Sequence, residues 1–62
     1  MKSIQEFLEV WNTCTHSLRT VILEGGSSFL ADGFNFTGTY FTFVRDRRFV
    51  ISIYLEDIKR IV

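Results

Sequence analysis

The closing segment, residues 49–62, constrains the fold of this chain more than any other feature. Phe49–Tyr54 alternates as a β-strand does, and Leu55-Glu-Asp57 interrupts the pattern for one turn. Ile58–Val62 then has the composition of another short strand. Few folds close with a strand, a single turn and a second strand, and small five-stranded barrels are the main group among them. The segment therefore predicts a small β-barrel.

The length of 62 residues allows one domain with a small core. Domains of this size usually rely on disulfides, a metal ion or self-association. Cys14 is the only cysteine, and with His16 it gives too few ligands for a closed zinc site. We therefore expect no disulfide, no metal and no other cofactor. Hydrophobic residues make up 47% of the chain, which favours a homo-oligomer with apolar surface facing another copy.

Seven basic and seven acidic residues give a net charge of zero, so the chain lacks the positive charge typical of nucleic-acid-binding proteins. The balance is uneven, because residues 33–62 carry five basic and three acidic side chains. No stretch approaches the roughly 20 apolar residues of a membrane span, and no apolar run near residue 1 predicts a signal peptide. With one unpaired cysteine, we expect a cytoplasmic protein without a membrane partner.

A helix is predicted over residues 3–12. Ser3 and Glu6 have the spacing of a capping box, in which the Ser3 hydroxyl accepts from the Glu6 amide. Apolar residues follow at the spacing of one helix face, at Ile4, Phe7, Leu8 and Trp11. Because so short a helix is unstable alone in water, its apolar face must pack on the rest of the domain.

Strands are predicted after the helix, over residues 18–24, 28–34, 39–44, 48–54 and 58–62. Gly25-Gly-Ser-Ser28 is the clearest turn, and Arg45–Arg48 is predicted to be a short charged hairpin loop. Gly38 is the candidate for a turn or bulge, because the aromatic residues on its two sides have opposite parity.

Alternation in the strand over residues 48–54 predicts which side chains share a face. One face is expected to carry Phe49, Ile51 and Ile53. The opposite face is expected to carry Val50, Ser52 and Tyr54.

The layout resembles the Sm-like (Hfq-like) family of small β-barrels. Thr20–Gly26 is similar to the first strand and its glycine turn, Phe29–Gly33 to the bent second strand, and Ile51–Ile58 to the closing strand–turn–strand unit. The resemblance implies a mainly β (α+β) fold, an N-terminal helix followed by a five-stranded antiparallel Sm-like or SH3-like small barrel. It also implies rings in which the outer strands of neighbouring subunits pair. The residues expected at this oligomer interface are Phe49, Ile51, Ile53, Ile58 and Ile61.

Two groups of side chains are candidates for binding. Arg45, Arg47 and Arg48 form the strongest charge cluster, and with aromatic residues nearby they could bind phosphate or stack on a base. The other interpretation is an ordinary solvated hairpin tip. The chain has more large apolar residues than the interior of one small barrel needs. Some of them, around the bend at Gly38, are expected at an interface. These residues are Phe34, Phe36 and Tyr40.

No catalytic site is predicted. Cys14 and His16 are the only pair that could act as nucleophile and base, and no third residue that would orient them can be identified. Glu56 and Asp57 are adjacent carboxylates, but acid–base chemistry needs a cleft, for which one subunit has no room. We therefore expect that the protein is not an enzyme.

The favoured function is a non-enzymatic, self-assembling small β-barrel that acts as a protein-binding module, such as a small inhibitor or adaptor of bacterial or phage type. Its zero net charge and surplus of aromatic residues motivate this hypothesis. The alternative is an Sm-like RNA- or nucleotide-binding protein that uses the Arg45–Arg48 loop.

Overall fold

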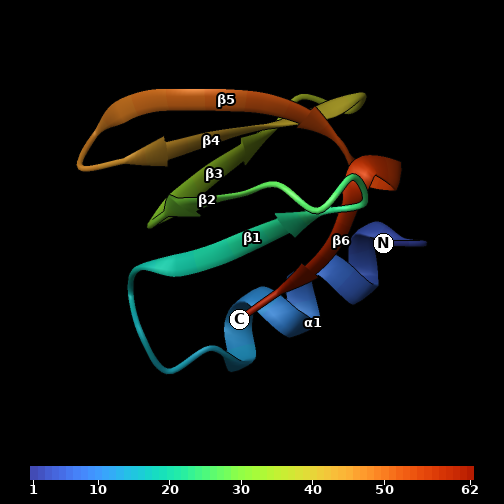
Figure 1. Cartoon of the computed structure of the whole chain (residues 1–62), viewed down its shortest axis with the longest axis horizontal. Coiled ribbons are helices and arrows are strands. Elements are labelled where there is room, and N and C mark those ends of the chain that lie inside the picture. The colour runs from blue at the N-terminus through green and yellow to red at the C-terminus, as the bar shows by residue number, and fades with distance from the viewer.

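One helix precedes two small antiparallel sheets in the computed structural model, which describes all of residues 1–62. One sheet has the strand order β2-β1-β6 and the other the order β3-β4-β5 (Figure 1). The elements are α1 (Ile4–Thr13), β1 (Arg19–Leu23), β2 (Ser28–Ala31), β3 (Gly33–Phe36), β4 (Tyr40–Arg45), β5 (Arg48–Tyr54), the 3₁₀ turn η1 (Leu55–Asp57) and β6 (Ile58–Ile61). The predicted mainly β fold with an N-terminal helix is confirmed.

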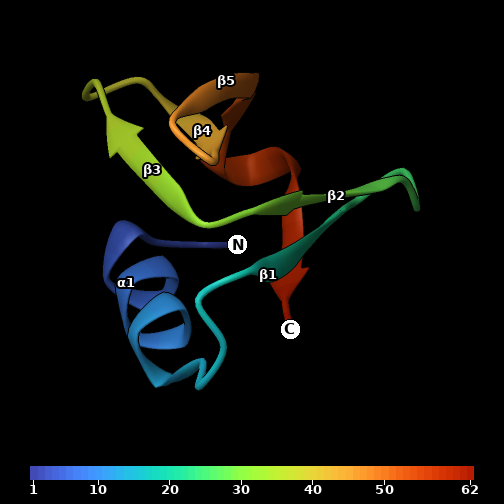
Figure 2. The same ribbon diagram turned by 90° about the vertical axis from the view of Figure 1, so that its left-hand side faces the viewer.

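The prediction of a closed barrel with five strands is wrong in its detail, because six strands form two separate three-stranded sheets. The predicted strand over residues 28–34 is divided into β2 and β3 at Asp32. The chain changes partner there: pairing with β1 ends at Ala31, and pairing with β4 begins at Gly33 opposite Val44. Figure 2 shows β2 running into β3 across this bend. The bend lets one continuous segment belong to both sheets.

The helix begins as its sequence predicts. The Ser3 hydroxyl accepts from the Glu6 amide at 3.0 Å, which satisfies one of the free amides of the first turn. The Glu6 carboxylate reaches back to the Lys2 amide, also at 3.0 Å, one residue further than a capping box requires. The boundaries, Ile4–Thr13, lie within one residue of the predicted ones.

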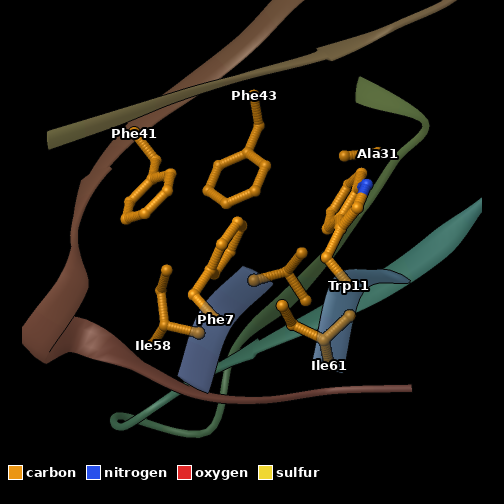
Figure 3. Close-up of a cluster of buried hydrophobic side chains, with 8 residues drawn as sticks. Phe7, Trp11, Ala31, Phe41, Phe43, Ile58 and Ile61 are labelled. Carbon is orange, nitrogen blue, oxygen red and sulfur yellow. The ribbon is translucent and has the colours of Figure 1, made fainter. Parts of the chain in front are cut away.

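The core lies between the helix and the two sheets. The Phe7 ring stands at its centre, with ring centroids 4.1 Å from Phe41 and 5.7 Å from Trp11. Figure 3 shows this ring between the phenylalanines of β4 and Ile58 of β6. The buried side chains are Phe7, Trp11, Val21, Ala31, Phe41, Phe43, Ile58 and Ile61. One helical phenylalanine therefore joins α1 to both sheets.

A bulge in β6 explains how Ile58 and Ile61 are both buried although they are three residues apart. Arg60 lies opposite Ile22, but the next pair along the ladder is Ile58 with Leu23, so Lys59 is an extra residue. An extra residue shifts the alternation by one, and the isoleucines on its two sides share a face. Lys59 and Arg60 are exposed.

Three distant segments meet at η1. The Met1 ammonium donates to the carbonyl oxygens of Leu55, at 3.2 Å, and of Ile58. The Glu24 amide, just after β1, donates to the Asp57 carbonyl at 2.9 Å. These bonds fix the turn from which β6 starts. Neither helical segment combines the length and hydrophobicity needed to cross a membrane.

Candidate interaction surface

A bulge in β5 turns Phe49 away from the core. Phe43 lies opposite Ile51, but the next residue of β4, Val44, lies opposite Phe49, so Val50 is an extra residue in β5. Phe49 therefore lies on the face opposite to Ile51 and Ile53, and its side chain is 66% exposed. The prediction that these three residues share a face is wrong at Phe49 for this reason.

The outer face of the β3-β4-β5 sheet is uncharged. The buried residues of β4, Phe41 and Phe43, point into the core, so the residues that alternate with them point outward. We call the outward set the outer face: Gly33 and Asn35 of β3, Tyr40, Thr42 and Val44 of β4, and Phe49, Ser52 and Tyr54 of β5. No Lys, Arg, Asp or Glu belongs to it.

Aromatic rings stand at both ends of the outer face. Tyr40 and Tyr54 form an edge-to-face pair with centroids 6.1 Å apart, and Tyr54 is 52% exposed. Phe49 lies at the other end, beside the half-buried Val44. Between them the Thr42 and Ser52 hydroxyls share a hydrogen bond of 3.3 Å. The result is a band with aromatic ends and a polar, uncharged middle.

The arginine loop is a tight two-residue turn with unusual backbone angles. Arg45 pairs with Arg48 in the ladder, and the residues between them, Asp46 and Arg47, have φ of 53° and 65°. Positive φ at both central positions is the type I′ pattern, which normally selects Asn-Gly. Each residue with a side chain costs about 1 kcal/mol in this region. The turn is held by Asp32, whose carboxylate accepts from the Asp46 amide at 2.9 Å.

The guanidinium groups of Arg45, Arg47 and Arg48 have no partner within the chain. No side-chain hydrogen bond or ion pair of the structure engages them. Arg45 and Arg48 lie directly opposite each other, an arrangement that like charges disfavour. The loop therefore exposes three arginines at the tip of a hairpin.

The structure does not bring the other predicted binding residues to this loop. Phe34 is half-buried against Phe7 and Trp11, with ring centroids at 4.8 Å and 5.0 Å. Phe36 is half-buried against Phe41 at 4.7 Å. Only Tyr40 is exposed, and it begins β4 whereas Arg45 ends it. Phe34 and Phe36 therefore contribute mainly to packing.

The residues predicted at a subunit interface fall into three groups. Phe49 is exposed, Ile51 and Ile53 are half-buried against the core, and Ile58 and Ile61 are fully or almost fully buried. β5 and β6 are each the last strand of a sheet, so the backbone along one edge of each has no strand partner. Pairing at those edges would use backbone groups and not the isoleucine side chains.

No hydrogen bond joins Cys14 to His16. The Cys14 thiol is half-buried and donates to the Val10 carbonyl at 3.3 Å, as a residue at the end of a helix commonly does. His16 is exposed. No group of histidine, cysteine or acidic side chains is placed to hold a metal ion.

The sequence analysis does not predict the outer face, although the length of the Asp46-Arg47 loop indicates it. A two-residue loop at Asp46-Arg47 places Phe49 opposite Val44, on the outside, whereas the alternation of Ile51 and Ile53 places it inside. These two requirements conflict, and a bulge between them is the usual way to satisfy both.

Comparison of the chain with protein-family models, curated proteins and solved structures found no match.

Proposed function

We propose that this protein is a non-enzymatic small β-domain of the cytoplasm that assembles with itself and acts as a protein-binding module. The observation that carries the proposal is the outer face, where Phe49, Tyr54 and Tyr40 are exposed without a charged neighbour on the same face. Aromatic residues are the commonest anchors of protein interfaces, and charged residues are depleted at interface centres. The free edges of β5 and β6 support self-assembly, because unpaired strand edges accept another strand.

The outer face also suits the binding of a protein better than the binding of a small molecule. It has no pocket, and small-molecule sites are concave cavities that cover most of the ligand. An exposed sheet face with aromatic ends instead fits another protein surface.

A double substitution of the outer face tests the proposal. Phe49→Ser with Tyr54→Ser removes two exposed rings and leaves every core residue in place. Wild type and variant, used as matched baits in a cell extract, should differ in the proteins that they retain. Light scattering should give the wild type a mass above that of one chain. Identical captured proteins, together with a monomeric wild type, would contradict the proposal.

A second candidate function is RNA or nucleotide binding by an Sm-like domain. The unpartnered arginines of the hairpin tip favour it, because Arg clusters recognise phosphate and stack on bases. A single turn separates β5 from β6, which is the strand–turn–strand arrangement on which the Sm-like resemblance rests. Filter binding of short RNA and of nucleotides at low salt tests this function. Arg47→Gln with Arg48→Gln should weaken binding, and no binding by the wild type would remove this candidate.

A further inference from the structure

We propose that Arg45 and Arg48 form a clamp for one terminal phosphate group, the phosphomonoester of a nucleotide or of an RNA end. The inference rests on the second candidate function, RNA or nucleotide binding, and names the chemical group that the hairpin tip recognises. Arg47 is not part of the clamp, although the three arginines are close together in the sequence.

The strand ladder places Arg45 and Arg48 side by side on one face of the sheet. Side chains alternate along β4, so Arg45 lies on the same side of the sheet as the buried Phe43. Arg48 lies directly opposite Arg45 in the ladder and shares that side. Side chains at such positions have Cβ atoms about 4.5–5.5 Å apart. The two side chains therefore leave the sheet from neighbouring points and in the same direction, whereas Arg47 lies in the turn, outside the ladder.

The clamp lies just beyond the end of the core. Phe43 is fully buried, whereas Arg45 and Arg48 are exposed. Figure 1 shows the loop between β4 and β5 at the far left, projecting beyond the other strands. A ligand in solution therefore reaches both guanidinium groups directly.

The acidic side chains at the tip leave the clamp free. The Asp32 carboxylate accepts from the Asp46 amide at 2.9 Å, so it holds the backbone of the turn. No hydrogen bond or ion pair joins either aspartate to Arg45 or Arg48. Three arginines against two aspartates also leave the tip with a net positive charge. Both guanidinium groups are therefore available to an anion.

Two energetic costs at the tip indicate that it is kept for binding. Like charges directly opposite each other destabilise a strand pair, as Arg45 and Arg48 do here. Asp46 and Arg47 have positive φ, 53° and 65°, in a turn that normally selects Asn-Gly. Residues that break local rules in this way cluster at functional sites. A bound anion removes the first cost, because it neutralises both guanidinium groups.

The clamp fits a terminal phosphate better than a phosphate inside a nucleic-acid chain. Near pH 7 a phosphate monoester carries a charge of about −1.5 to −2 and offers three acceptor oxygens. A phosphate within the chain carries a single negative charge and has fewer free oxygens. A carboxylate also carries a single charge. Because each guanidinium forms two parallel hydrogen bonds to such groups, two arginines match the monoester in charge and in donors.

The first experiment compares ligands that differ only in the terminal phosphate. Adenosine monophosphate is titrated against adenosine, and a short single-stranded RNA with a 5′-phosphate against the same RNA with a 5′-hydroxyl, at about 0.1 M salt. In at least one pair the phosphorylated member should bind about tenfold more tightly. Amide signals of the loop between β4 and β5 should shift in NMR spectra. The pair with the larger difference identifies the source as a free nucleotide or an RNA end.

Single substitutions test which arginines form the clamp. Arg45→Gln and Arg48→Gln should each weaken binding of the phosphorylated ligand by about tenfold or more. Arg47→Gln removes the same charge from the same loop, so it is the matched control and should weaken binding less than about threefold. Arg48→Lys keeps the charge but not the planar guanidinium, and should lose part of the affinity.

Arg48→Glu gives a second measurement that needs no ligand. The new carboxylate lies opposite Arg45, so attraction replaces repulsion across the strand pair. The midpoint of urea unfolding should therefore rise while binding of the phosphorylated ligand is lost. A lower midpoint would contradict the placement of these two side chains opposite each other, and with it the clamp.

Three results would overturn the inference. Equal affinity for the phosphorylated and unphosphorylated ligands would exclude the terminal phosphate as the group recognised. Equal losses in Arg47→Gln and Arg48→Gln would indicate general charge attraction and no clamp. A phosphoserine peptide that binds more tightly than both nucleic-acid ligands would assign the two arginines to a protein partner.

The outcomes separate the clamp from the function on which it rests. If RNA binds with and without its 5′-phosphate equally well, the second candidate function stands and the clamp is wrong. If neither RNA nor nucleotide binds the wild type, that function fails as well.

Discussion

The guanidinium carbon of Arg19 lies 4.2 Å from the centre of the Trp11 ring. The same guanidinium donates from Nε and Nη2 to the Trp11 carbonyl oxygen, at 3.2 and 3.1 Å. Trp11 lies near the end of α1, where the helix dipole favours a cation, and its carbonyl also accepts from the Cys14 amide at 3.4 Å. Arg19 is the first residue of β1, so its side chain links the end of the helix to the start of the sheet.

Replacement of Arg19 should loosen the helix. Arg19→Met keeps a long apolar side chain but removes the cation above the ring, both hydrogen bonds to Trp11 and a third from Nη1 to the Ser17 carbonyl at 2.8 Å, so we expect a loss of about 1–3 kcal/mol in the free energy of unfolding. Arg19→Lys keeps the charge and should lose less. Urea denaturation measures the difference. Arg60→Met, at an exposed position of β6, is the control and should stay within about 0.5 kcal/mol of wild type. Equal effects at the two positions would contradict the role of Arg19.

Two phenylalanines offer a matched test of the core and the outer face. Phe7 is fully buried and Phe49 is 66% exposed, so the same change to leucine has different consequences. Phe7→Leu leaves a gap among several rings and should cost about 1–3 kcal/mol, a large share of the stability of a small domain. Phe49→Leu should cost less than about 0.5 kcal/mol at concentrations where the protein is monomeric. Thermal or urea denaturation of both variants gives the comparison, and a larger loss at Phe49 would place that ring in a core.

The positive backbone angles of the arginine loop predict a stabilising substitution. Arg47 has φ of 65°, a conformation that glycine adopts without the penalty of a side chain. Arg47→Gly should therefore raise the free energy of unfolding by about 0.5–1 kcal/mol. Arg47→Lys is the control, because it keeps the side chain and the charge and should give no gain. A destabilising Arg47→Gly would mean that the arginine makes contacts that outweigh its backbone cost.

The helix and most strand positions could be predicted because each depends on local pattern. Ser3 and Glu6 mark the start of α1, and the spacing of Phe7 and Trp11 marks its buried face. The residue bounds of β5 follow from its composition alone. The division of the predicted strand at Asp32 could not be read in this way, because it depends on which strand each half finds as a partner. Such pairing joins residues that are far apart in the sequence.

In the candidate site too, local pattern predicts some residues, and others depend on how the strands pair. Arg45, Arg47 and Arg48 were identified from charge and loop composition, and the structure places them on one hairpin tip. The outer face depends on one extra residue, Val50, which reverses the direction of Phe49. Alternation predicts a face only within an unbroken ladder, and a bulge interrupts the ladder without a clear sign in composition.

A side chain at residue 33, at the bend between the sheets, should destabilise the fold. A Cβ atom added to Gly33 would lie 3.0 Å from Cγ2 of Val44, and the branched valine has little freedom to turn away. Gly33→Ala should therefore lower the free energy of unfolding by about 1 kcal/mol, as overpacking does. Val44→Ala removes the opposing methyl groups, so the double variant should be more stable than the sum of the single losses predicts, with a coupling of about 1 kcal/mol. Urea denaturation of wild type, both single variants and the double variant measures this coupling. Strictly additive losses would show that the two residues do not meet, and the close approach of β3 and β4 at the bend would then be wrong.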